Sequence, residues 1–150
     1  MHVDVVDQPE LRIAGIRHIG PYHEIGKAFG SLGGLLKGPP PAGSMMIGVY
    51  HDDPDKTPAS QLRSDAAITL PNNAPTPDGL IENRLPAGRY AKLVHRGGYE
   101  GLPAAWKALK SEWLPKSGFT NASTSYELYV NNPMTAAKAD LITEIFLRVA

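Results

Sequence analysis

Apolar and polar positions along the chain divide it into two series of elements in the same order. Six stretches are rich in β-branched and aromatic residues and have the length of strands: residues 11–18, 45–50, 65–70, 89–95, 125–130 and 143–149. Two longer segments are predicted as helices: residues 22–36 and 102–116. The order is strand, helix, strand, strand, and it occurs twice. It predicts an α+β protein in which two small antiparallel layers carry two helices.

The second predicted helix has the clearer amphipathic pattern. Leu102, Trp106, Leu109 and Trp113 are separated by four, three and four residues, so their side chains lie on one face. Pro103 is compatible with the first helical turn, where its missing N–H costs no hydrogen bond. The first predicted helix contains several glycines and is expected to be less regular.

The two series are also similar residue by residue. A shift of 77 positions aligns residues 12–22 with residues 89–99, and both segments contain a His-x-Gly-x-Tyr turn. A shift of 79 positions aligns residues 50–54 with residues 129–133, and both segments begin with Tyr and end with Pro. Ordered matches of this kind indicate a tandem duplication of one strand-helix-strand-strand unit.

The duplication suggests how the chain is organised. We expect a single domain, residues 1–150, built of two repeats at about 3–71 and 80–150. A linker rich in Pro and Gly, at about 71–79, joins the repeats. Two copies of one unit create a pseudo-twofold axis, and the cleft along that axis is a natural place for a central ligand pocket.

Glu127 is an unusual residue for its position. Within the predicted strand 125–130, the alternation of side chains places Glu127 on the same face as Tyr129. Glutamate is depleted in strands, and an unpaired buried charge costs several kcal/mol. A shift of 79 positions places Gly48 opposite Glu127, so one repeat offers space where the other offers a carboxylate. Either Glu127 points into water, or the protein needs a negative charge there.

Composition excludes several classes of function. Lys plus Arg and Asp plus Glu number 15 each, so no basic surface for nucleic acid is indicated. The absence of cysteine excludes disulfides and thiolate metal sites, and the spacings of metal sites, phosphate loops and serine nucleophiles are absent too. The first residues lack the pattern of a signal peptide, and no apolar stretch reaches about 18 residues. We predict a cytoplasmic protein without metal, cofactor, membrane contact or direct nucleic-acid binding.

Four features, in this order, resemble the GyrI-like small-molecule-binding domains. They are Leu-Pro-Ala-Gly-Arg-Tyr-Ala at 85–91, the His-x-Gly-x-Tyr turn at 95–99, a helix ending in Trp113-Leu114, and Tyr-Glu-Leu-Tyr followed by Asn-Asn-Pro within 126–133. Weaker versions of two of them recur in the first half, so the resemblance covers nearly the whole chain. It implies a duplicated strand-helix-strand-strand fold with a central hydrophobic pocket.

The resemblance also implies a function. In drug-sensing members of the family, a buried Glu in the strand that matches residues 125–130 pairs with cationic aromatic drugs, and Glu127 occupies that place. The leading hypothesis is a stand-alone effector-binding domain, related to those of AraC-type and MerR-type transcription regulators, that recognises amphipathic cationic or aromatic molecules, as in multidrug recognition. The predicted ligand-binding residues are Glu127, Tyr129, Tyr99, Trp106, Tyr22, Gly48 and Phe29.

Two other functions known in the family stay open. One is a hydrolase that opens cyclopropane-containing genotoxins, with Glu127 as acid or base and Tyr99 beside it. The other is an interaction module whose partner is gyrase or a DNA-binding regulator. Structural roles are also open, with Glu127 on a solvated strand face and the tryptophans and tyrosines in the core. Asp65 and Glu144, equivalent in the repeats, are expected in solvent at the start of a strand, outside the pocket.

Overall fold

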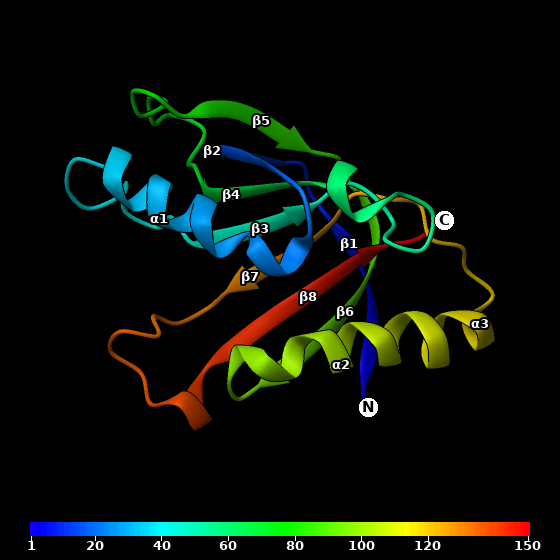
Figure 1. The fold of residues 1–150 in the computed structure, drawn as a ribbon. Coiled ribbons are helices and arrows are strands. Elements are labelled where there is room, and N and C mark those ends of the chain that lie inside the picture. The colour runs from blue at the N-terminus through cyan, green and yellow to red at the C-terminus, as the bar shows by residue number, and fades with distance from the viewer.

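The computed structural model describes residues 1–150, which form eight strands and two main helical segments (Figure 1). The strands are β1 (Val3–Gln8), β2 (Leu11–Ile19), β3 (Met46–Tyr50), β4 (Arg63–Thr69), β5 (Ile81–Leu85), β6 (Gly88–Arg96), β7 (Ser125–Tyr129) and β8 (Ile142–Arg148). The α-helices are α1 (Gly26–Leu35), α2 (Leu102–Ala108) and α3 (Leu114–Ser117). All six predicted strands and both predicted helical segments are present, so the expected mixture of helices and sheet is confirmed.

The strands form one antiparallel sheet in the order β1-β6-β8-β7-β3-β4-β2-β5. The prediction of two small layers is therefore wrong. β3 and β7 pair at the centre of the sheet, with Gly48 directly opposite Glu127. Without this pairing each half would expose the polar backbone groups of one central strand, which is a costly arrangement for two apolar strands.

The sequence pattern does not predict the two edge strands, β1 and β5. β1 pairs with β6 and β5 pairs with β2, so each edge strand pairs with one strand from the other half of the chain. Four of the five residues of β5 are exposed and only Leu85 is buried. Its sequence therefore lacks the apolar alternation by which a strand is recognised.

Both helical segments lie on the same face of the sheet (Figure 1). α1 packs on β2 and β4, and Leu32 and Ile68 belong to the apolar cluster beneath it. α2 contributes to a second cluster that contains Ile145 of β8 and, just beyond the helix, Leu109. The register places Ile145 directly beside Glu127, which puts both side chains on the helix-covered face.

The opposite face of the sheet has a core of its own, made of strand side chains. Tyr126 and Phe146 stack there with ring centroids 4.8 Å apart, and Tyr90 packs against both. Burial on both faces explains the apolar run 66–68, because a strand with no solvated face needs no polar alternation.

The helical segments are less regular than predicted. A 3₁₀ turn, Tyr22–Glu24, precedes α1, and a π-helical turn, Leu109–Trp113, separates α2 from α3. Trp113 lies in the apolar cluster under α2, where it stacks on Phe119. The spacing of apolar residues predicted a continuous α-helix and gave no signal for the π turn. None of the helices combines the length and apolar character that a membrane span requires.

Candidate functional site

A cleft of about 1230 Å³ lies over the middle of the sheet, between the two helical segments. Its floor contains Glu127 and Tyr129 of β7 and Tyr50 of β3. Phe29 of α1 lines one side, and Trp106 of α2 lines the other. Most of its exposed surface is apolar, which is a common property of small-molecule sites.

Glu127 is buried in the floor of this cleft, with 3% of its surface exposed. Three side chains donate hydrogen bonds to its carboxylate. Oε1 accepts one from the hydroxyl of Tyr50 and one from the hydroxyl of Tyr129, both at 2.8 Å. Oε2 accepts one from Nε1 of Trp106 at 2.6 Å. The interpretation of Glu127 as an acid on a solvated strand face is therefore wrong.

No cationic side chain neutralises Glu127. The ion pairs of the protein involve other carboxylates throughout. Hydrogen bonds from neutral donors stabilise a carboxylate, but they leave its full negative charge in place. The floor of the cleft therefore offers a fixed anionic group that is shielded from water.

The two tyrosine donors remain protonated over the physiological range. Burial, and then the charge and hydrogen bonding of Glu127, raise the pKa of Tyr50 well above its usual value. Burial has the same effect on the pKa of Tyr129, with further contributions from the neighbouring Tyr50 and Glu127. Both hydroxyls therefore act as hydrogen-bond donors to the carboxylate, because neither releases its proton at neutral pH.

Aromatic rings surround the carboxylate in two sets. Tyr50 and Tyr129 each lie between one ring from the first half of the chain and one ring from the second. The ring centroids are 4.9 Å apart for Tyr22–Tyr50, 6.2 Å for Tyr50–Trp106, 5.7 Å for Phe29–Tyr129 and 5.5 Å for Tyr99–Tyr129. All four contacts are edge-to-face or tilted, the geometry that aromatic pairs prefer.

Gly48 lies beneath the two tyrosine hydroxyls. A Cβ added to Gly48 would come 2.8 Å from the hydroxyl oxygen of Tyr129 and 3.2 Å from that of Tyr50. These are the hydroxyls that bind Glu127, so the missing side chain gives them the room they need. The space expected opposite Glu127 is thus filled by hydrogen-bond donors, and Gly48 does not line the cleft itself.

Gly48→Ala is expected to lower the free energy of unfolding by about 1–3 kcal/mol, since an added methyl group would overpack the site and displace the hydroxyls. Urea denaturation measures the change. Gly30→Ala is the matched control, because Gly30 lies on α1 with open space around its Cα and should gain stability or stay unchanged. Equal stability of the two variants would contradict the tight fit at Gly48.

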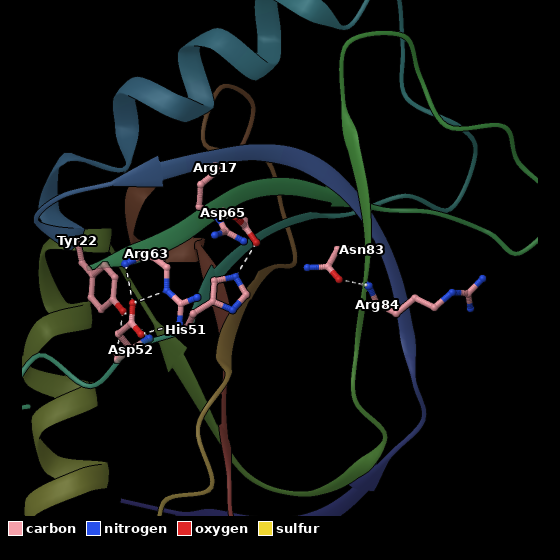
Figure 2. A network of polar contacts seen from close by, with 8 residues as sticks. All are labelled: Arg17, Tyr22, His51, Asp52, Arg63, Asp65, Asn83 and Arg84. Atoms are coloured by element: carbon pink, nitrogen blue, oxygen red, sulfur yellow. Dashed lines mark hydrogen bonds and ion pairs between the residues drawn. The ribbon is translucent and has the colours of Figure 1, made fainter. Parts of the chain in front are cut away.

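Tyr22 fixes the wall of the cleft to the loop that follows β3. Its hydroxyl donates to the backbone oxygen of Asp52 at 2.7 Å and accepts from the backbone nitrogen of Asp52 at 2.9 Å. The carboxylate of Asp52 in turn binds the guanidinium and the backbone N–H of Arg63 (Figure 2). Burial raises the pKa of Tyr22 to about 12. The ring of Tyr22 therefore faces the cleft, while its hydroxyl has a structural role.

Asp65 does not lie in solvent, contrary to the expectation from its place near a strand start. Only 7% of it is exposed, and it binds Nε of Arg17 at 2.6 Å and Nε2 of His51 at 2.7 Å (Figure 2). Burial alone would raise the pKa of Asp65, but the hydrogen bonds and charges of His51 and Arg17 outweigh it and lower that pKa. The partly buried Glu144 pairs with Lys92 at 3.1 Å.

Both acids face away from the cleft. The register pairs Asp65 with Val49 and Glu144 with Leu128, and both partners belong to the core on the far face of the sheet. Neither acid lines the cleft. Their exclusion from the cleft agrees with the sequence-based expectation. The reason is that both side chains point to the far face of the sheet, and not that they lie in solvent.

The structure brings most of the predicted site residues together. Six line the cleft: Glu127, Tyr129, Tyr99, Trp106, Tyr22 and Phe29. The prediction missed Tyr50, which donates a hydrogen bond to Glu127, and Lys110, which also lines the cleft. Tyr50 could have been predicted, because the shift of 79 positions aligns it with Tyr129. No sequence signal pointed to Lys110.

Comparison with known proteins defines the class of protein. The model of the GyrI-like small molecule binding domain matches residues 1–150. A DNA gyrase inhibitor of Erwinia billingiae is 31% identical, with 100% of this chain and 98% of the relative covered. A DNA gyrase inhibitor of Yersinia enterocolitica is 30% identical over 88% of each chain. The chain belongs to the GyrI-like small-molecule-binding domain family, as its sequence features predict.

Solved structures show the same fold. The C-terminal domain of EcmrR has a TM-score of 0.80 at 18% identity, covering 99% of this chain and 97% of the other. A protein described as SAV2435 bound to tetraphenylphosphonium has a TM-score of 0.71 at 15% identity, with 100% and 94% covered. A hydrolase from Listeria innocua has a TM-score of 0.65 at 13% identity, with 99% and 91% covered. These three proteins therefore share the fold of this chain.

Proposed function

We propose that this chain is a binding protein for amphipathic organic cations with aromatic groups. The observation that carries the proposal is the carboxylate of Glu127, which is buried, held by three neutral donors and paired with no cation of the protein. A cationic ligand would supply the missing positive charge.

The surroundings of Glu127 favour an organic cation over an inorganic one. Ring faces of tyrosine and tryptophan attract a cation by about 0.5–2 kcal/mol each. A metal ion would need several oxygen ligands to replace its water, and the cleft offers Glu127 as its one buried carboxylate. A large cation with a delocalised or shielded charge loses less hydration and fills more of the apolar volume. The tetraphenylphosphonium bound to SAV2435 is a cation of this kind.

We further infer that the cleft lies between two duplicated units, residues of about 3–71 and 80–150, within one domain. The ring contacts support this arrangement, since Tyr50 with Tyr22 and Trp106 matches Tyr129 with Tyr99 and Phe29. The antiparallel pairing of β3 with β7 around Gly48 and Glu127 is compatible with a pseudo-twofold axis at that point.

The proposed function is tested with two molecules of similar shape and different charge. Isothermal titration calorimetry with methyltriphenylphosphonium and with triphenylphosphine oxide compares a cation with a neutral molecule. We expect the cation to bind at least tenfold more tightly and to stabilise the protein by about 2.7 kcal/mol at 100 times its Kd. Equal affinities, or no binding of the cation, would contradict the proposal.

The alternative is hydrolysis of a strained, electrophilic ring, with Glu127 as acid or base. A carboxylate in a cleft shielded from water is a suitable general base, and the hydroxyl-bearing ring of Tyr99 lies nearby. The fold shared with a hydrolase is compatible with this function. Incubation with a cyclopropane-containing electrophile, followed by mass spectrometry, would reveal a ring-opened product that wild type forms and Glu127→Gln does not.

The second alternative is an interaction with gyrase or with a DNA-binding regulator. This alternative is supported by the names of the relatives described above, which are DNA gyrase inhibitors. A supercoiling assay with purified DNA gyrase decides the first case. Inhibition that persists in a variant with a blocked cleft would indicate an outer surface as the binding site, and the absence of inhibition would remove this alternative.

A further inference from the structure

Lys110 introduces a positive charge into a cleft that otherwise favours cations. It is the only lysine or arginine among the lining residues. Lys110 belongs to the π-helical turn Leu109–Trp113, about one turn after Trp106, so the two side chains point to the same side of the helix. Helical residues four apart are separated by about 6 Å along the helix axis. Lys110 therefore lies about this far along the helix from Trp106, whose indole donates to Glu127.

The ammonium group of Lys110 is poorly satisfied. Its single polar contact is Oδ1 of Asp53 at 3.5 Å, the limit of a hydrogen bond. The same oxygen accepts a shorter hydrogen bond of 2.9 Å from the backbone nitrogen of Asp55. An ammonium group has three donors, so Lys110 keeps hydrogens free for another acceptor. Its side chain is 25% exposed, which is consistent with access from the cleft.

The charge of Lys110 is present at one end of the cleft only. The shift of 77 positions that relates the two helices places Gly33 at the position of Lys110, and Gly33 does not line the cleft. The shift of 79 positions places the uncharged Asn132 at the position of Asp53. The cleft is therefore asymmetric in charge, with the Glu127 carboxylate in its floor and the Lys110 ammonium group, beside Asp53, on one side.

From this arrangement we infer a second subsite, in which Lys110 binds an anionic group of the ligand. The inference rests on the proposed cation site at Glu127 and defines its ligand class more narrowly. The favoured ligand is an aromatic zwitterion, with a cationic group over Glu127 and a carboxylate or similar acceptor at Lys110. Asp53 gives up its long contact with Lys110 on binding and keeps its hydrogen bond from Asp55.

Rhodamine B and its ethyl ester test the subsite, because they share one cationic ring system and differ in a single carboxylate. Fluorescence anisotropy gives the Kd of each dye. In wild type, we expect the free acid to bind more tightly than the ester. Lys110→Met should weaken the acid about tenfold and leave the ester within about twofold, while Lys110→Arg should keep the preference for the acid. Lys107→Met is the matched control, because Lys107 lies on the exposed side of the same helix and outside the cleft.

The outcomes separate this subsite from the cation site. If the ester binds, is sensitive to Glu127→Gln, and the acid is unaffected by Lys110→Met, the Lys110 subsite is wrong and the cation site stands. Equal losses of acid and ester in Lys110→Met would also reject the subsite, since the lysine would then act on cleft shape alone. Failure of both dyes to bind wild type would overturn both proposals.

Discussion

Glu127→Gln is expected to weaken the binding of methyltriphenylphosphonium by about 2–5 kcal/mol, because it removes one member of a desolvated charge pair. Triphenylphosphine oxide should lose far less, since it carries no charge for Glu127 to bind. Calorimetric titration of both compounds into wild type and variant measures the difference. An enzyme would respond differently, with turnover abolished and substrate binding largely kept.

The same substitution should also affect the empty protein. Three donors point at the carboxylate, and a carboxamide accepts at its oxygen only. Its NH₂ group would meet the N–H of Trp106 or the two tyrosine hydroxyls, so at least one buried donor would lose its acceptor. The cost is about 1–3 kcal/mol, and the relief of a buried charge offsets part of it.

Glu144→Gln is the matched control for this experiment. It is the same chemical change on the neighbouring strand, on the face of the sheet that points away from the cleft. Its ligand affinities should equal those of wild type within about twofold. If both variants lose the cation equally, or if neither does, Glu127 is not the group that binds positive charge.

Asp65→Asn is expected to lower the free energy of unfolding by about 1–3 kcal/mol at neutral pH. The buried carboxylate joins Arg17 to His51, and a neutral amide would leave both hydrogen bonds weaker and the charge of Arg17 uncompensated. The lower part of the usual range for buried pairs applies, because the side chain of Arg17 is 39% exposed and therefore partly solvated. Urea denaturation of wild type and variant gives the difference, with the exposed Asp55→Asn as control.

The effect of Asp65 should depend on pH in a defined direction. The folded protein lowers the pKa of Asp65, so its stabilising contribution is complete above the ordinary carboxyl pKa of about 4. It decreases as the pH falls below that value toward the folded pKa. The stability difference between wild type and Asp65→Asn should therefore shrink as the pH falls below about 4. A difference that stays constant over this range would contradict the role of the ionised carboxylate, and ligand affinity at neutral pH should stay within about twofold.

Local sequence determined the identity and order of the main elements. Period-two alternation placed Glu127 and Tyr129 on one strand face, and the internal similarity paired Tyr22 with Tyr99 and Tyr50 with Tyr129. These inferences concern neighbours along one strand or equivalent places in two similar segments. Such relations are present in the sequence itself, and they carry the resemblance to the family.

Tertiary structure decided what each side chain faces. The hydroxyl of Tyr50 reaches Glu127 across 77 residues of sequence, and Arg17 reaches Asp65 across 48. Strand alternation says which residues share a face, but it does not say which strand lies beside them. The pairing of β3 with β7 brought the two halves into one sheet and the hydroxyl of Tyr50 to Glu127, and the packing of α2 over the sheet brought the indole of Trp106 to the same carboxylate. The local pattern specified a carboxylate among aromatic residues. Long-range packing determined that this carboxylate is buried, which groups donate to it, and that no cationic side chain pairs with it.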